Sequence, residues 1–264
     1  MQYRMIIKFI VICAVMTFIP QVSGGHSRRE AHGAEDYPER EEIERTFQIS
    51  RDARVEVSGV AGGPVDIETA NGDTAEVHVV RSAQTRTELD CYRTVIEHTP
   101  DSLTLRHEQA TGRDECRSIR AGQRVRLRVP RSVELNLRSI GGEVNVGATD
   151  GVLRLNGIAG HVKVNHSQAA EIAGLAKGLT MTIAQLGERG ISISGVVGHV
   201  ELNLAKNLNA DLTVSNIIGV DGKATGVTMT KVDASSSRTR IGRGGAPISI
   251  SGIVGSVAIN HSTN

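Results

Sequence analysis

The chain has 264 residues, and its 30 Lys and Arg residues against 29 Asp and Glu residues leave a formal net charge of +1. This balance excludes a protein that binds nucleic acid through a bulk positive charge. Aromatic residues make up 2% of the chain and tryptophan is absent, whereas 39% is hydrophobic, so we expect a folded protein with a core of small aliphatic side chains.

Residues 1–24 have the pattern of a secretory signal peptide. Arg4 and Lys8 precede an apolar run that ends at Pro20, and small residues precede a cleavage site after Gly24. The run is short for a membrane span of about 20 residues, although an uncleaved anchor stays an alternative. We therefore expect an extracytoplasmic protein, located in the periplasm, at the cell surface or in the medium, with no membrane span in the mature chain.

Residues 25–45 are rich in charge and poor in aliphatic side chains, which predicts a flexible linker. Cleavage after Gly24 would remove Arg4 and Lys8 and no acid, so the mature charge would be +1 − 2 = −1.

Two cysteines, Cys91 and Cys116, remain after the predicted cleavage. In an oxidising compartment such a pair predicts a disulfide, which would stabilise the fold by roughly 3–4 kcal/mol through loop closure. Two buried free thiols are the alternative. A metal site is not expected, because no second pair of ligands lies nearby in the sequence.

From Val133 onward the chain repeats an apolar pattern with a period of 16 to 21 residues. The copies start near residues 135, 153, 170, 191, 212, 232 and 248, the fifth and sixth being weak. Glycines lie near the middle of most copies, in strings such as NGIAGHVKV and SGVVGHVEL, which predicts strand, tight bend and strand. Stacked copies would place like residues about 4.8 Å apart and would enclose a narrow aliphatic core.

These repeats predict an all-β fold, a right-handed parallel β-solenoid of short coils. We expect residues 131–264 to form the solenoid and residues 46–130 to form an irregular β-rich cap, with 46–264 as one continuous domain. The last coil ends without an obvious cap, so its edge is a candidate for self-association.

The chain carries no recognisable catalytic or cofactor motif. His161 and His199 occupy the same repeat position, but two copies apart they would be about 9–10 Å from each other, too far to share a metal ion. Acidic residues in the repeats form no convincing catalytic pair. We therefore predict no enzyme activity, no cofactor and no metal, with a carbohydrate-active enzyme as one alternative and a self-assembling scaffold as another.

The strongest local charge is basic, between Arg117 and Arg138. Within it Arg124, Arg126 and Arg128 alternate with Val125, Leu127 and Val129, so the three arginines should share the outer face of one strand. Such a row suits phosphate, sulfate or uronate, and we identify it as a candidate surface for an anionic envelope polymer or glycan. A solvated strand face that guards a sheet edge is the alternative.

The strings VEVSGVAGGPVDIETANGDTAEVHVV and VRLRVPRSVELNLRSIGGEVNVGATDG, with the later SGxxGxVxx copies, resemble the bacterial putative-adhesin β-strand-repeat family, a domain of unknown function. The resemblance covers roughly residues 44–260. It implies a repetitive β fold, export to the cell envelope and an adhesin-like binding or structural role, and it supplies no catalytic residues.

Overall fold

The computed structural model describes residues 37–110, 116, 121–218, 223–225, 230–231 and 236–261. The predicted signal peptide lies outside these residues. The chain divides between Glu30 and Ala31, and every described residue belongs to the second unit. Among the described residues, no helix has the length and apolarity needed to cross a membrane.

Strands dominate the described residues, and one short helix, α1 (Arg86–Cys91), interrupts them. The strands before β9 are β1 (Glu39–Gln48), β2 (Arg54–Ser58), β3 (Val65–Ala70), β4 (Thr74–Ala83), β5 (Tyr92–Thr99), β6 (Ser102–Gln109), β7 (Ala121–Pro130) and β8 (Glu134–Ile140). The later strands are β9 (Val144–Ile158), β10 (His161–Leu175), β11 (Gly178–Ile183), β12 (Ile191–Leu204), β13 (Ala210–Ile218), β14 (Lys223–Thr225), β15 (Thr230–Lys231), β16 (Ser236–Ile241) and β17 (Pro247–His261).

The all-β class is as expected, but the predicted right-handed parallel β-solenoid is wrong, because the sheet is mixed. Antiparallel pairs join β1 to β4, β4 to β7, β5 to β6, β13 to β16 and β15 to β16. One cause is local. Only Pro100 and Asp101 separate β5 from β6, and so short a connection can join antiparallel strands but not parallel ones. The weak repeat near residue 232 likewise yields β16, which runs antiparallel to β13, and its residues 232–235 lie outside the described chain.

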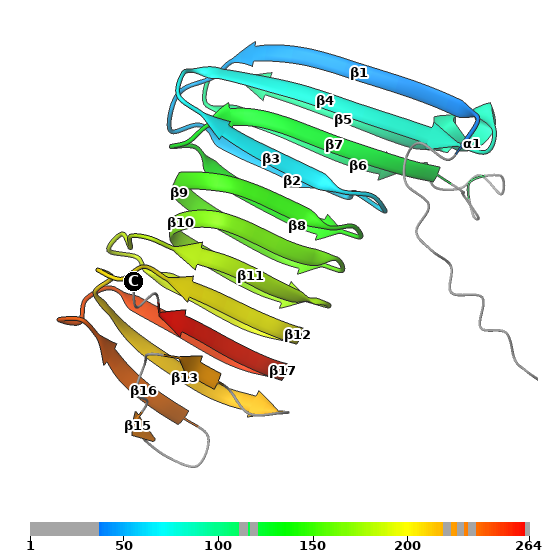
Figure 1. The fold of residues 1–264 in the computed structure, drawn as a ribbon. Helices are drawn as coiled ribbons and strands as arrows, with labels where there is room; N and C mark the ends of the chain where they lie inside the picture. Colours follow the sequence, from blue (N-terminus) through cyan, green and yellow to red (C-terminus); the bar gives the residue numbers. More distant parts are fainter. Residues whose placement is uncertain are drawn as a thin grey trace, which may run out of the picture. The chain divides into compact units, whose positions relative to one another are not determined.

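In the middle of the unit, parallel strands lie side by side with like residues in register (Figure 1). The buried residues Ile140, Ile158, Leu175, Val196 and Ile253 follow one another across five strands, as the repeat predicts. Each aliphatic side chain therefore packs against its counterparts on the neighbouring strands. This explains how the core is filled without tryptophan.

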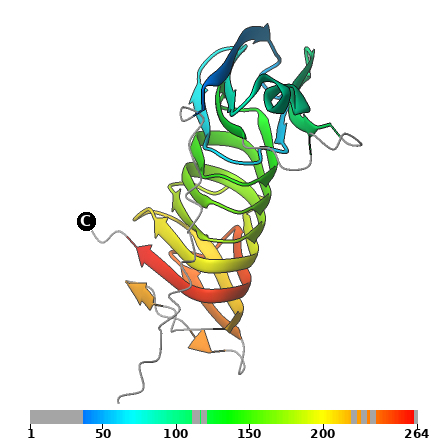
Figure 2. The same cartoon turned by 90° about the vertical axis from the view of Figure 1, so that its right-hand side faces the viewer.

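Two of the long strands, β9 and β10, pair with different neighbours along different parts of their length. The first part of β9 pairs with β3 and its last part pairs with β8, and β10 bridges in the same way to β11 and β12. Figure 2 shows these strands curving from one side of the stack to the other.

The order of the strands in space differs from their order in the chain. The last strand, β17, lies between β12 and β13 and is hydrogen-bonded to both. At the other end β2 lies between β6 and β8 in the same manner. The last coil therefore does not present the open edge that the sequence suggested for self-association.

The prediction of a flexible linker over residues 25–45 does not hold for its last part. The predicted linker 25–45 overlaps β1, which pairs along its whole length with β4. Ile43 and Phe47 turn toward the core from one side of β1. β4 continues the antiparallel arrangement to β7, and β7 in turn pairs in parallel with β3.

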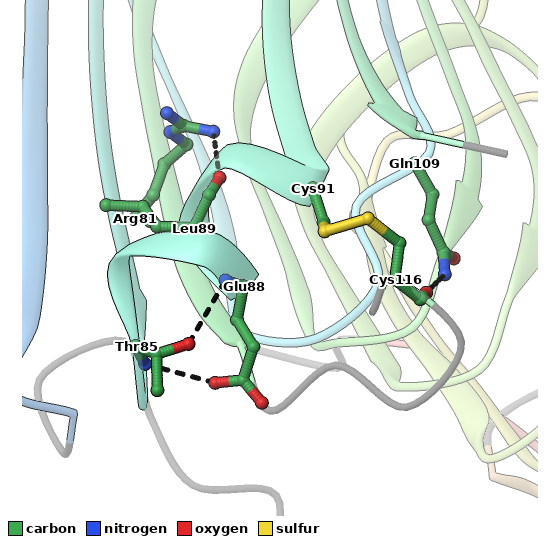
Figure 3. The surroundings of a disulfide bond; sticks show 7 residues. All are labelled: Arg81, Thr85, Glu88, Leu89, Cys91, Gln109 and Cys116. Carbon is green, nitrogen blue, oxygen red and sulfur yellow. Dashed lines mark hydrogen bonds between the residues drawn. A yellow bond between two sulfur atoms is a disulfide. The ribbon is translucent and has the colours of Figure 1, made fainter. Parts of the chain in front are cut away.

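The predicted disulfide between Cys91 and Cys116 is confirmed (Figure 3). It joins the end of α1 to the segment after β6, where Gln109 Nε2 donates a hydrogen bond of 2.6 Å to the carbonyl of Cys116. A capping box between Thr85 and Glu88 begins α1. The buried Arg81 holds the helix on β4 by donating to the carbonyl of Leu89 at 3.3 Å.

At seven equivalent positions, six within strands and one directly after β2, the backbone has a left-handed conformation. Glycine occupies most of these positions, but Ser139 has φ +54° and Asn216 has φ +52°. The corresponding glycines in the register are Gly59, Gly157, Gly174, Gly195 and Gly252. Glycine adopts this conformation without the steric penalty that a Cβ introduces.

We therefore expect Ser139→Gly to stabilise the protein by roughly 0.5–1 kcal/mol, since it relieves the Cβ penalty of a left-handed residue. The reverse change on the next strand, Gly157→Ala, should destabilise by roughly 1–2 kcal/mol, because φ there is +66°. Urea unfolding of the two variants beside the wild type measures both signs. Equal midpoints for all three proteins would contradict the account of this bend.

Candidate functional site

The three candidate arginines lie on β7, the strand between β4 and β3. Val125, Leu127 and Val129 are buried, while Arg126 and Arg128 are exposed and Arg124 is half-buried. The alternation in the sequence thus reflects which side chains face the core. We call the outward side chains of β1, β4, β7 and β3 the charged face, which consists of Glu42, Glu44, Glu76, His78, Arg124, Arg126, Arg128, Asp66 and Glu68.

Charged or ionisable residues of both neighbouring strands flank Arg126 and Arg128. Arg128 lies between Glu76 of β4 and Glu68 of β3, and its Nη1 is 3.3 Å from Glu76 Oε1. Arg126 lies between His78 of β4 and Asp66 of β3. The sequence missed this charge compensation because counting charge along the chain overlooks residues that come from neighbouring strands.

The other arginines of the basic stretch do not join this face as a cluster. Arg131 forms an ion pair with Asp150 at 3.3 Å, and Arg138 pairs with Glu56 on β2. Arg117 and Arg120 lie outside the described residues. The local positive charge of the sequence is therefore distributed among separate ion pairs.

A depression of about 310 Å³ opens on the charged face. Its lining combines both signs of charge, and its residues are Glu44, Arg45, Thr46, Glu68, Glu76, Val77, His78, Arg126, Leu127 and Arg128. Such a lining can hold an oxyanion against the guanidinium groups, and it also offers carboxylate and imidazole groups at its β1 side.

His78 connects β4 to β1 at that side of the depression. Its Nε2 is 2.6 Å from Glu42 Oε1 and 3.9 Å from Glu44 Oε1. The hydrogen bond with His78 lowers the pKa of Glu42, desolvation opposes this shift, and the nearby charge of Arg40 lowers the pKa further. The sequence analysis missed Glu42 and Glu44 because both fall within the predicted linker, and it missed His78 because its partners come from this distant segment.

A larger hollow, of about 820 Å³, lies over β8, β9, β10 and β12. Its polar lining includes Arg138, Arg154, Glu171 and Ser194. The Arg154 guanidinium contacts Glu134 and lies 3.1 Å from Glu171. An arginine between two carboxylates is a typical surface ion-pair network. The charged residues that line this hollow are thus already engaged in ion pairs.

His161 and His199 lie on strands separated by β11, as the repeat spacing predicts. His161 Nε2 is 3.2 Å from Thr180 Oγ1, and His199 Nδ1 is 2.7 Å from Ser256 Oγ. Each histidine is thus part of its own hydrogen-bonded pair.

No family model matches the chain, and no curated protein resembles it in sequence. A comparison of structures finds matches among solved proteins. A "putative cell adhesion protein" from Clostridium sporogenes is 10% identical, with a TM-score of 0.46 over 84% of this chain and 100% of its own. A "putative adhesin" and a "putative lipid binding protein", both from Parabacteroides distasonis, are each 13% identical with a TM-score of 0.28. They cover 84% and 88% of this chain, and 97% and 99% of their own.

These structural neighbours are mostly adhesin-like proteins. At these TM-scores and identities, they add no argument about the ligand or activity of this chain.

Proposed function

We propose that the chain is an exported, non-enzymatic, adhesin-like module of the cell envelope that binds an anionic polymer through its charged face. The observation that carries the proposal is the depression on that face, which Arg126 and Arg128 line together. The disulfide supports the extracytoplasmic location, because such bonds are typical of oxidising compartments.

The charged face carries five carboxylates and three arginines, so an anion would bind at the arginines by replacing their acidic partners. The side chains of Arg128 and Glu76 are 54% and 53% exposed, and an ion pair this exposed contributes about 0–1 kcal/mol. A sulfate or uronate group that contacts a guanidinium through two oxygens can replace such a pair at little cost. Several weak contacts along a polymer would then add up through multivalency.

Polygalacturonate is a suitable probe, with dextran as the uncharged comparison. We expect binding to polygalacturonate that weakens as salt increases, because exposed charges are screened. The double variant Arg126→Gln/Arg128→Gln should bind about tenfold more weakly or worse, since two charge-assisted contacts are lost. Glu76→Gln should bind more tightly, because it removes the ion-pair partner of Arg128.

The matched control is Arg54→Gln/Arg240→Gln, which removes two exposed arginines from β2 and β16. It changes the net charge by the same amount and should leave binding close to that of the wild type. Binding that is independent of salt, or equal losses in the two double variants, would overturn the proposal for this face.

A further inference from the structure

Three side chains with metal-ligating groups converge where β1 meets β4. Glu42 and Glu44 are two residues apart on β1, so they point to the same face, and His78 lies directly opposite Glu44 in the register. One ligand atom from each residue, two carboxylate oxygens and the imidazole Nε2, lies within 4.8 Å of the other two.

We propose that Glu42, Glu44 and His78 bind Zn²⁺. Zinc takes imidazole nitrogen and carboxylate oxygen at about 2.0–2.2 Å in a tetrahedral arrangement. The His78 Nε2–Glu42 Oε1 distance of 2.6 Å shows that these two groups already approach each other closely, and Glu44 Oε1 is 3.9 Å from the same nitrogen. Zinc binding would require side-chain rotations that bring all three atoms to one ion, and the exposed side chains of Glu42 and Glu44 have room to rotate.

The ligand set favours zinc over calcium and magnesium. Calcium takes six to eight oxygen ligands, and magnesium retains most of its water and binds oxygen. A neutral imidazole that joins two carboxylates suits a borderline ion such as Zn²⁺. Zinc would replace the hydrogen bond between His78 Nε2 and Glu42 Oε1, because the ion needs the Nε2 lone pair.

The strands fix the ligand geometry more firmly than a loop would. The register that places His78 opposite Glu44 belongs to a ladder that runs the full length of β1. The other carboxylate oxygen of Glu42 lies 3.8 Å from Arg40, which helps to orient it. Arg126, opposite His78 on β7, adds a nearby positive charge, so we expect zinc to exchange rather than to be held permanently.

Three protein ligands leave a fourth coordination position for water or another ligand. Glu44 and His78 line the same depression as Arg126 and Arg128, so solvent reaches the cluster from there. The three zinc ligands are distinct from Arg126 and Arg128, so Zn²⁺ binding can be measured in the absence of any polymer.

Calorimetric titration of the metal-stripped, untagged chain with Zn²⁺ tests the proposal. We expect one zinc ion to bind at this cluster, and His78→Ala and Glu44→Gln each to lower the affinity at least about tenfold. His161→Ala is the matched control, because it removes a histidine from β10 and should leave the titration unchanged. His26 and His32 lie outside the described residues, so the difference between each variant and the wild type is the quantity measured.

Two further measurements keep the result unambiguous. Circular dichroism shows whether each variant is folded, and Glu44→Gln serves if His78→Ala does not fold. Co²⁺ substituted into the wild type should give the visible absorption of a four-coordinate ion, and His78→Ala should lose it. Equal Zn²⁺ affinity in the wild type and both variants would overturn the proposal. Binding of Ca²⁺ as tight as that of Zn²⁺ and independent of His78 would overturn it too.

Discussion

Gly160→Ala is expected to destabilise the protein by about 3 kcal/mol or more, near the upper end for added volume in a packed site. A Cβ at this position would lie 2.0 Å from the carbonyl oxygen of Gly142 and 2.5 Å from the amide nitrogen of Glu143. Both atoms belong to the backbone of the preceding bend, so no side-chain rotation relieves the contact. The neighbouring strands would have to separate, and their parallel hydrogen bonds would weaken.

Urea unfolding followed by far-UV circular dichroism measures this loss. Gly62→Ala is the control, because a Cβ there meets nothing within 4 Å and its φ is not left-handed. That variant should remain within about 0.5 kcal/mol of the wild type. If both alanine variants unfold at the same urea concentration, close backbone approach does not explain the recurring glycines.

The repeat predicted which residues are buried and which share a register, but it did not predict the order of the strands. Ile253 illustrates the reason, because it fits equally well beside Val196 or beside Ile217 and in fact lies between them. Copies that share one apolar template are interchangeable by local criteria. The choice among them depends on how connecting segments return across the stack, which periodicity alone does not encode.

The candidate face shows the same division between local and long-range information. Alternation on β7 placed Arg126 correctly, whereas its neighbours His78 and Asp66 come from distant parts of the chain. The signal for β1 consisted of two apolar residues, Ile43 and Phe47, which both pack against the core. The high charge of residues 25–45 concealed this strand. Two apolar residues four positions apart are a weak pattern in a segment rich in glutamate.

His107 should make the stability of the protein depend on pH between about 6.5 and 4. The imidazole is buried on β6 and stacks with Tyr92, with ring centroids 5.9 Å apart, and its Nδ1 is 3.1 Å from Thr94 Oγ1. Among the described residues, its Nε2 has no hydrogen-bond partner. Burial, aided by the positive charge of Arg81, lowers the pKa of His107 from 6.5 to about 4.

The sign follows from proton binding. Below pH 6.5 the unfolded chain takes up a proton at His107 that the folded protein does not bind until about pH 4. The contribution to stability is therefore complete above pH 6.5 and is lost as the pH falls toward 4. At about 1.4 kcal/mol per pH unit, the free energy of unfolding should decrease by roughly 3 kcal/mol across this window because of His107.

Carboxylates titrate in the same range, so the comparison that isolates His107 is between the wild type and His107→Gln, which cannot take up this proton. The variant should be less stable than the wild type at pH 7.5, because the ring stacking on Tyr92 is lost. Between pH 6.5 and 4 its free energy of unfolding should fall less steeply, so that the two curves converge. Urea unfolding at half-unit pH intervals measures both curves, and curves that remain parallel through the window would show that His107 is protonated equally in the folded and unfolded states.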